Sequence, residues 1–288
     1  MSVIIFGANG YLGRNLIHKL SIQERDVIAL SRSFDEDFFL NYPEITRHSI
    51  DFRDQHTYAD FVQEGDVIIH LIYMGIPFQA NLDKKSDILN NLIPSVELAE
   101  LCAAKSIKRL VYASSGGTVY GDSEEKLINE DHPCDPVNSY GITKLATEKY
   151  IRAISRENKM DYAILRISNP YGGFPNPQSP VGLFAKIEQC LVNDMPFELR
   201  VPMETTRDYI PIEDVVQVFI NMIDHKQPVF DTFNVSSGQG LSIHEVIEMM
   251  EEKHCKKVII NEVSPNNPEV RCNILDNSKL KSLFPKVN

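Results

Sequence analysis

The chain has 288 residues, 43% of them hydrophobic, and a formal net charge of −11 at pH 7. This length and apolar content predict one large α/β unit with an appended lobe, or two closely connected domains. The negative charge argues against nucleic acid or an anionic membrane as the main partner, because both require a basic surface.

Short apolar runs alternate with amphipathic stretches through the first half of the chain. Residues 3–6 predict a buried parallel strand, and a helix is expected to begin within 15–20, after a glycine-rich loop. Further strands are predicted at 27–30, 67–71, 110–113 and 163–167, and helical stretches at 57–63, 88–105 and 144–157. This alternation is typical of a doubly wound parallel sheet.

The pattern changes after Ser168. The segment 169–177 is too rich in proline and glycine for regular structure, so we expect a loop that leaves the sheet. Beyond it the sequence predicts helices at 183–192, 212–223 and 243–252, and short strands at 197–201 and 258–260. We expect a main domain of residues 1–168, joined by late elements from about 207–236, and a smaller C-terminal lobe of 169–206 and 237–288.

A glycine-rich loop, Gly7-Ala8-Asn9-Gly10-Tyr11-Leu12-Gly13, lies between the first predicted strand and helix. This arrangement places backbone N–H groups and a helix N-terminus where a pyrophosphate can bind. The G-x-x-G-x-x-G spacing favours a sheet of the short-chain dehydrogenase type. The alternative is a loop that only turns the chain.

The second predicted strand ends in Ser31-Arg32-Ser33, where NAD-dependent sheets usually carry an acidic residue. A cation here can bind a 2′-phosphate, which favours NADP(H) over NAD(H), although an exposed loop arginine would look the same. Asp51, followed by Phe52, comes after a third short strand. Asp51 is predicted to accept a hydrogen bond from the adenine amino group, unless the segment is an ordinary turn.

Tyr140 and Lys144 form a Tyr-x-x-x-Lys pair on a predicted helix. The i, i+4 spacing puts both side chains on one face, and a lysine ammonium nearby favours the phenolate form of the tyrosine. Hydroxyl groups follow the preceding strand at Ser115 and Thr118. Together these residues predict a proton-transfer site around a substrate oxygen.

With these motifs the chain resembles the extended short-chain dehydrogenase/reductase superfamily, and within it the NAD(P)-dependent nucleotide-sugar epimerase/dehydratase family. The resemblance runs to about Lys279 and includes Asn91 and the segments 166–172, 207–210, 234–238 and 276–279. It implies an α/β fold, in which a Rossmann-type doubly wound sheet binds NAD(P) and a smaller C-terminal lobe binds the nucleotide sugar. Cell-surface polysaccharide synthesis is the usual setting of the family.

The resemblance also implies roles for individual residues. Tyr140 would be the general acid/base, and Lys144 would contact the nicotinamide ribose with support from Asn91 through an ordered water. Asn169 and Arg207 would face the nucleotide sugar, Arg207 on its diphosphate; the alternative for Arg207 is a surface salt bridge. The residues expected to bind the cofactor are Gly7, Asn9, Gly10, Tyr11, Leu12, Gly13, Ser31, Arg32, Asp51, Phe52, Leu71, Asn91, Tyr140 and Lys144.

Some positions depart from the family pattern. Counting forward from the strand places the catalytic hydroxyl at Ser115, whereas counting back from 119–121 reaches Gly116, so we expect Ser115 with Thr118 as the alternative. Gly117-Thr118 replaces the Asp-Glu pair of sugar dehydratases, which disfavours dehydration. Tyr73 ends a His-Leu-Ile-Tyr run where relatives carry His-Leu-Ala-Ala, and Arg271 is expected to replace a second diphosphate-binding arginine.

Two reactions at sugar C4 remain open. An NADPH-dependent reductase would act on a nucleotide-diphosphate 4-keto-6-deoxyhexose, and a 4-epimerase would use tightly bound NAD. Arg32 and the short C-terminal lobe favour the reductase. A non-catalytic dinucleotide-binding regulator is a third hypothesis, but it would be expected to lose Tyr140 or Lys144.

Other features bear on the setting of the protein. Five unpatterned cysteines indicate reduced thiols, and no metal site is predicted. The N-terminal apolar run is too short for a signal peptide or a membrane span, so we expect a cytoplasmic protein. Apolar positions on 88–105 and 144–157 exceed what one sheet face needs, so we expect a homodimer; the alternative is that these helices simply cover the sheet.

Overall fold

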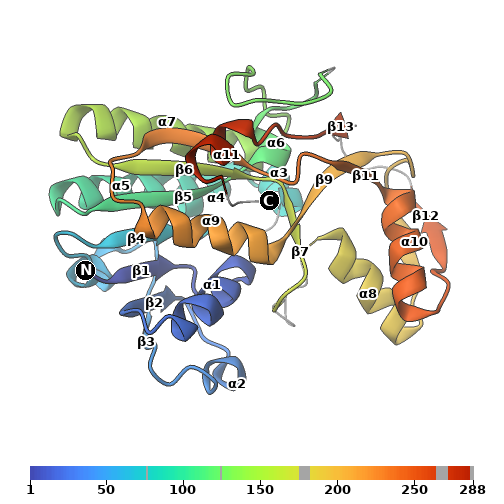
Figure 1. Cartoon of the computed structure of the whole chain (residues 1–288), viewed down its shortest axis with the longest axis horizontal. Coiled ribbons are helices and arrows are strands. Elements are labelled where there is room, and N and C mark those ends of the chain that lie inside the picture. Colours follow the sequence, from blue (N-terminus) through green and yellow to red (C-terminus); the bar gives the residue numbers. More distant parts are fainter. Residues whose placement is uncertain (76, 124, 175–181, 264–271, 286–288) are drawn as a thin grey trace.

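A computed structural model describes residues 1–75, 77–123, 125–174, 182–263 and 272–285. Within these ranges the largest sheet has seven parallel strands in the order β10-β6-β5-β4-β1-β2-β3 (Figure 1). Its strands are β1 Val3–Phe6, β2 Val27–Ser31, β3 Thr46–Ser49, β4 Val67–His70, β5 Arg109–Ser115, β6 Tyr162–Ile167 and β10 Phe230–Val235.

The central strands are apolar almost throughout because helices cover both faces of the sheet. Every residue of β1 and β4 is buried, as is every residue of β6. An alternating pattern would have left one face in water, whereas a continuous apolar run suits a parallel strand between two helical layers. The predicted doubly wound α/β fold is therefore confirmed.

Two helical layers enclose the sheet (Figure 1). Helices α1 (Tyr11–Ile22) and α9 (Ile212–Asp224) share one apolar core with the sheet, and α2 (Glu36–Phe39) and α11 (Ser278–Leu283) each add a buried side chain to it. Helices α5 (Ile93–Ala104) and α7 (Ser139–Asn158) cover the opposite face with a second core.

A smaller group of elements lies beyond the carboxyl ends of the strands (Figure 1). Helices α8 (Leu183–Asn193) and α10 (Ile243–His254) contribute to a third apolar core. One small sheet is built on β9 (Thr206–Pro211), and β8 pairs with β12 in another. The remaining strands of these sheets are β7 Asn169–Tyr171, β11 Gly240–Ser242, β13 Cys272–Asn273, β8 Phe197–Leu199 and β12 Ile260–Glu262.

Two sequence-based predictions of secondary structure are wrong. The segment 57–63 is not a helix but parts of two 3-10 turns, Gln55–Thr57 and Ala59–Phe61, because Tyr58 leaves helical geometry at φ −139° and buries its ring against Phe6. The expected loop after Ser168 begins with strand β7, which pairs with the distant β9. Residues 175–177 of that loop lie outside the described ranges.

Short elements link the sheet to the helices around the site. After β4 come α3 (Pro77–Leu82), α4 (Lys84–Asp87) and a π-helical turn, Ile88–Leu92, that leads into α5. After β5 comes α6 (Gly116–Val119).

Cys102, Cys134, Cys190 and Cys255 are free thiols. In the described ranges, no helix combines the length and apolar character needed to cross a bilayer.

Candidate active site

The glycine-rich loop joins β1 to α1 and leaves the start of that helix open. Gly10 is the N-cap residue, and it makes no side-chain capping hydrogen bond. A β-carbon on Gly13 would lie 2.5 Å from the Gly7 carbonyl oxygen and 2.6 Å from that of Ala8, so only glycine allows α1 to pack this closely on the loop. Uncapped N–H groups above such a cradle fit a dinucleotide pyrophosphate.

Asn9 organises the loop instead of pointing freely from it. Its side-chain oxygen accepts from Arg14 Nη2 at 3.1 Å and from the Asp35 N–H at 3.3 Å. The buried Arg14 also pairs with Asp35 at 2.7 Å, which holds the pKa of that carboxyl below its ordinary value. This Arg14–Asp35 pair was not anticipated from the sequence, and the arginine directly after the third glycine is the only signal for it.

The residues predicted for the adenosine end lie after β2 and β3. Ser31 ends β2, and Arg32 after it is exposed. Asp51 is bound by Arg53, whose Nη2 lies 2.7 Å away, and this pairing lowers the pKa of Asp51 to about 2. Phe52 is 4% exposed and packs in the core against Phe6. Its side chain is therefore a core residue, so any contact of Phe52 with the cofactor would come from its backbone, and this contact stays a prediction.

Leu71 and Asn91 lie near the end of β4. The Leu71 N–H donates to the Phe6 carbonyl at 2.9 Å, which places Leu71 beside the glycine loop. Asn91 accepts from the Met74 N–H at 2.6 Å and donates to the Met74 carbonyl at 3.1 Å. Its side chain therefore fixes the segment after β4, and the water-mediated support of Lys144 stays a prediction.

Tyr140 and Lys144 lie in the first turns of α7. Asn138 caps this helix by accepting from the Gly141 N–H at 2.8 Å. A β-carbon on Gly141 would lie 2.8 Å from the Thr118 carbonyl oxygen. Glycine after the tyrosine therefore lets the helix approach the loop that carries Ser115 and Thr118. The predicted juxtaposition of the Tyr-x-x-x-Lys pair with this hydroxyl loop is present in the structure.

Lys144 is a buried cation among aromatic rings. It is 3% exposed, its Nζ donates to the Ala113 carbonyl at 2.8 Å, and it lies 4.8 Å from the Tyr112 ring centroid and 5.9 Å from that of Tyr140. Burial lowers the pKa of Lys144 to about 7, although Glu148 and Asp87 oppose the shift. Its charge is therefore poised to respond to a bound ligand.

Burial also raises the pKa of Tyr140 above its ordinary value, while a hydrogen bond with Ser115 lowers it and the Asp87 charge raises it. Of the two candidate hydroxyls, Ser115 is therefore the one that affects the pKa of Tyr140. Thr118 Oγ1 is buried and has no hydrogen-bond partner among the described residues. This arrangement favours Ser115 over Thr118, and the catalytic role of either hydroxyl stays a prediction.

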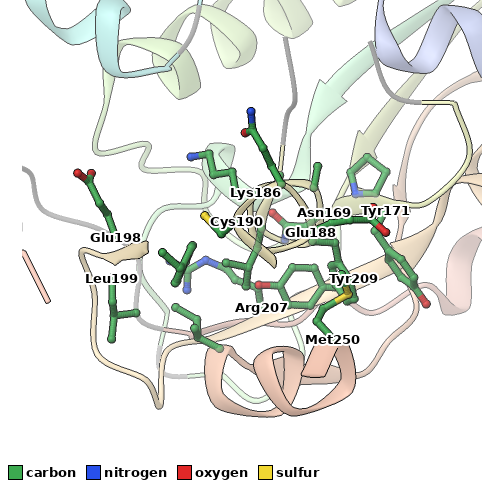
Figure 2. A pocket seen from close by; sticks show the side chains of 18 of the residues that line it. Asn169, Tyr171, Lys186, Glu188, Cys190, Glu198, Leu199, Arg207, Tyr209 and Met250 are labelled. Atoms are coloured by element: carbon green, nitrogen blue, oxygen red, sulfur yellow. The ribbon is translucent and has the colours of Figure 1, made fainter. Parts of the chain in front are cut away.

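A cavity of about 830 Å³ lies between the glycine-rich start of α1 and the small C-terminal elements. Figure 2 shows Asn169, Arg207 and Tyr209 among the side chains around it. Tyr11 of α1 also lines the cavity, and its hydroxyl donates to the Gly172 carbonyl at 2.9 Å. Two residues predicted for the substrate thus share one cavity, which borders the predicted cofactor loop.

Strand β9 and its neighbours hold these two residues in place. Asn169 donates to the Asp208 carbonyl at 2.8 Å. The Asp208 carboxylate is fully buried and accepts backbone N–H groups from Ser237 and Gly238 at 2.9 and 3.1 Å. Neighbouring residues of a strand point to opposite faces, and Arg207, next to Asp208, lines the cavity. Arg271, predicted as a second diphosphate ligand, lies outside the described residues.

The parallel sheet, the glycine cradle at β1 and the Tyr-x-x-x-Lys pair beside Ser115 define an NAD(P)-dependent enzyme of the extended short-chain dehydrogenase/reductase type. A family model for the NAD dependent epimerase/dehydratase family matches residues 3–236. The chain belongs to this family, as its sequence motifs predict. Its membership supports an enzyme over the non-catalytic regulator.

Relatives of known name include both candidate activities. The chain is 28% identical over 284 residues to a dTDP-4-dehydro-6-deoxyglucose reductase of Escherichia coli, covering 95% of this chain and 88% of the relative. It is 26% identical over 260 residues to a putative UDP-glucose 4-epimerase of Methanocaldococcus jannaschii, covering 87% and 82% of the two chains.

Solved structures confirm the fold. The UDP-glucose 4-epimerase of Thermus thermophilus, in complex with NAD, superposes with a TM-score of 0.90 at 22% identity, covering 100% of this chain and 95% of that one. The UDP-glucose 4-epimerase of Thermotoga maritima, with UDP-glucose, gives 0.88 at 22% identity, covering 98% and 92%. The chain is thus a nucleotide-sugar epimerase/dehydratase-family enzyme, and its particular reaction is a matter for proposal.

Proposed function

We propose that this protein is an NADPH-dependent reductase of a nucleotide-diphosphate 4-keto-6-deoxyhexose. The observation that carries the proposal is the setting of Tyr140: its ring packs on Tyr73 at a centroid distance of 4.5 Å, and burial raises its pKa, although Ser115 opposes this shift. A tyrosine that keeps its proton at neutral pH is suited to donate it to a ketone oxygen. An epimerase must first remove a proton from a hydroxyl, which requires the phenolate.

In this reaction the sugar C4 ketone would lie beside Ser115 and Tyr140. The reduced nicotinamide supplies a hydride. Tyr140 donates its proton to the C4 oxygen, so the C=O bond becomes an alcohol, while Ser115 hydrogen-bonds that oxygen. Lys144, with a pKa of about 7, would hold the nicotinamide ribose and restore charge balance beside the tyrosine. Arg207 and Asn169 would orient the nucleotide diphosphate from the neighbouring cavity.

The name of the Escherichia coli relative supports this substrate class, whereas other relatives are named UDP-glucose 4-epimerases. Incubation with dTDP-4-dehydro-6-deoxyglucose and NADPH should therefore lower the absorbance of the reduced nicotinamide, in proportion to the amount of sugar C4 alcohol that is formed. The alternative 4-epimerase would instead convert UDP-glucose to UDP-galactose with no added cofactor. Epimerisation without NADPH consumption would refute the reductase.

Arg32 is the proposed determinant of NADP(H) preference. It is exposed at the end of β2, and the nearest downstream carboxylate, Asp35, is engaged by Arg14 and caps α2. A ribose 2′-phosphate would thus meet the Arg32 cation, while Asp35 is already paired with Arg14. Arg32→Ala should raise the NADPH dissociation constant about tenfold and leave that of NADH within about twofold.

Fluorescence titration of both cofactors measures this preference. Arg25→Ala is the matched control, because Arg25 precedes β2 at the opposite end of the strand and pairs with Asp224 at 2.7 Å. Its NADPH affinity should equal that of the wild type. Equal binding of NADPH by the Arg32 variant and the wild type, or a wild-type preference for NADH, would assign the cofactor as NAD(H).

A homodimer through α5 and α7 is proposed for the same enzyme. The two helices pack side by side, and Leu89, Ile93 and Tyr150 near and on them are 48%, 42% and 49% exposed. Tyr150→Glu should convert the dimer to a monomer in analytical ultracentrifugation, because it would bury a charge in the interface. Val192→Glu on α8, at an equally apolar exposed position, should leave the mass unchanged. A monomeric wild type would refute the dimer.

We also place the enzyme in the cytoplasm, in the synthesis of polysaccharide precursors. This setting follows from the nucleotide-sugar substrate that the proposal assigns. Detection of the activity in the cytosolic fraction of the source cell would test it.

A further inference from the structure

A buried carboxylate, Asp87, lies behind the Tyr140–Lys144 pair. It is 5% exposed and ends α4, just before the π-helical turn. Oδ1 accepts from the Tyr73 hydroxyl at 2.6 Å and from Asn91 Nδ2 at 2.9 Å. Oδ2 accepts from the hydroxyls of Ser139 and Thr143 at 2.6 and 2.9 Å. A carboxyl group this deep in the protein is costly to bury without such donors.

These donors come from both sides of the catalytic tyrosine. Ser139 precedes Tyr140 in α7, and Thr143 precedes Lys144. Tyr73 comes from the segment after β4, and its ring meets the Tyr140 ring edge to face at a centroid distance of 4.5 Å and an interplanar angle of 81°. Asp87 therefore connects the first turn of α7 with a ring that packs directly on Tyr140.

The segment that carries Tyr73 is itself fixed. Asn91 binds both the N–H and the carbonyl of Met74, and also donates to Asp87. Asn81 of α3 accepts from the Ser139 N–H at 2.8 Å. With these contacts neither Tyr73 nor the start of α7 can shift without breaking several buried hydrogen bonds.

We propose that Asp87 is a positioning residue, which acts through Tyr73 and the first turn of α7 to hold the Tyr140 ring for proton transfer. This inference deepens the proposed function and rests on the role of Tyr140 in it. Tyr73 occupies a position where the family pattern His-Leu-Ala-Ala has alanine. Its larger side chain connects the buried Asp87 carboxylate to the Tyr140 ring.

Removal of the Asp87 charge should also change the pH dependence of kcat and the titration of Tyr140. Among the described residues, the titratable and charged groups around Asp87, Tyr140 and Lys144 are His70, Tyr73, Tyr112 and Glu148. Burial lowers the pKa of His70 to about 3, and it raises the pKa values of Tyr73 and Tyr112. These three groups are neutral near pH 7, and Glu148 is paired with Arg166 at 2.7 Å.

The Asp87 charge acts on both Tyr140 and Lys144, and this fixes the direction of the expected pKa shifts. The Asp87 charge raises the pKa of both Tyr140 and Lys144, because it disfavours a phenolate and favours an ammonium. Asp87→Asn should therefore move the alkaline limb of the kcat profile to lower pH by about 0.5–1 unit. It should also lower kcat about tenfold, with the KM for the nucleotide sugar within about twofold, because the ring that transfers the proton is held less well.

The experiment compares Asp87→Asn with Asp83→Asn, using dTDP-4-dehydro-6-deoxyglucose and NADPH. Asp83 precedes the same short helix, is exposed, and caps it by accepting from the Ser86 N–H, which an asparagine can also do. Its variant loses the same charge and should match the wild type. An Asp87→Asn variant that loses kcat without any shift of the pH profile would have a structural role alone, which would overturn the proposal.

A second measurement needs neither substrate nor turnover. Tyrosine labelled with carbon-13 at Cζ reports phenol ionisation by NMR, and the Tyr140 signal is assigned by its loss in Tyr140→Phe. That signal should titrate at lower pH in Asp87→Asn. Tyr73→Phe keeps the ring and the buried charge, so it should lower kcat without moving the titration downward; it serves as the second variant if Asp87→Asn does not fold. Unchanged kcat in Tyr73→Phe would overturn the proposal.

Different results would refute the catalytic role of Tyr140 and the positioning role of Asp87. If Tyr140→Phe retains full turnover, the proposed catalytic role of Tyr140 fails. If Tyr140→Phe is inactive while Asp87→Asn is identical to the wild type in kcat, pH profile and NMR titration, the positioning role of Asp87 alone is wrong.

Discussion

Tyr140→Phe is expected to lower kcat by about 10²–10⁴-fold, the usual contribution of a positioned general acid. The variant removes only the phenolic oxygen, whose pKa Ser115 affects. Its ring can still pack on Tyr73 at the same 4.5 Å contact, so the fold and NADPH affinity should be retained. Because proton donation is lost while binding groups remain, the effect should fall on kcat with little change in KM.

Steady-state kinetics with dTDP-4-dehydro-6-deoxyglucose and NADPH provide the measurement. Tyr150→Phe is the matched control, since it makes the same change on the same helix at a position that is 49% exposed. It should retain wild-type turnover. A Tyr140→Phe enzyme that keeps more than about a tenth of wild-type kcat would assign the proton donor to another group.

Gly13→Ala is the second substitution for which we expect a large effect, here on NADPH affinity and on the free energy of unfolding. Its β-carbon would lie 2.5 Å from the Gly7 carbonyl oxygen and 2.7 Å from the Ala8 carbonyl carbon, both of them backbone atoms that cannot rotate away. The loop and the start of α1 must therefore move apart, which distorts the proposed pyrophosphate cradle. We expect NADPH affinity to fall about 10–100-fold and the free energy of unfolding to fall by about 1–3 kcal/mol.

Fluorescence titration and denaturant unfolding measure the two effects. Gly65→Ala is the control: Gly65 has φ +78°, and an added β-carbon meets nothing within 4 Å. It should cost about 1 kcal/mol of backbone strain and leave NADPH affinity unchanged. Normal NADPH binding by folded Gly13→Ala would mean that the cofactor does not use this cradle.

Much of the fold was predictable because its main signals are local. β1, β2, β4, β5 and β6 are short apolar runs, and burial on both faces keeps such runs continuous. Strands of the C-terminal part were harder to predict. β9, Thr206–Pro211, mixes charged and apolar residues, and its partners β7, β11 and β13 come from distant parts of the chain. Pairing of this kind leaves no periodic pattern in any one segment.

Part of the candidate site was predictable for the same reason. The Gly13 spacing and the Tyr140–Lys144 pair are defined by a loop of a few residues and one helical turn, so the sequence contains their geometry. The sequence left Ser115 and Thr118 as alternatives for the catalytic hydroxyl, and the structure favours Ser115 because this residue affects the pKa of Tyr140. The burial of Phe52 also required the structure, because its position after a short strand does not show that its side chain turns into the core.

By itself the sequence determined the class of sheet, the glycine-rich loop and the helical spacing of Tyr140 and Lys144, because each depends on neighbours within one turn or loop. The tertiary structure alone decided which distant groups surround them. Asp87 meets Thr143 across 56 residues, Tyr11 meets Gly172 across 161, and Arg14 meets Asp35 across 21. Such contacts arise from the packing of helices on a shared sheet, and packing in three dimensions has no fixed spacing along the chain.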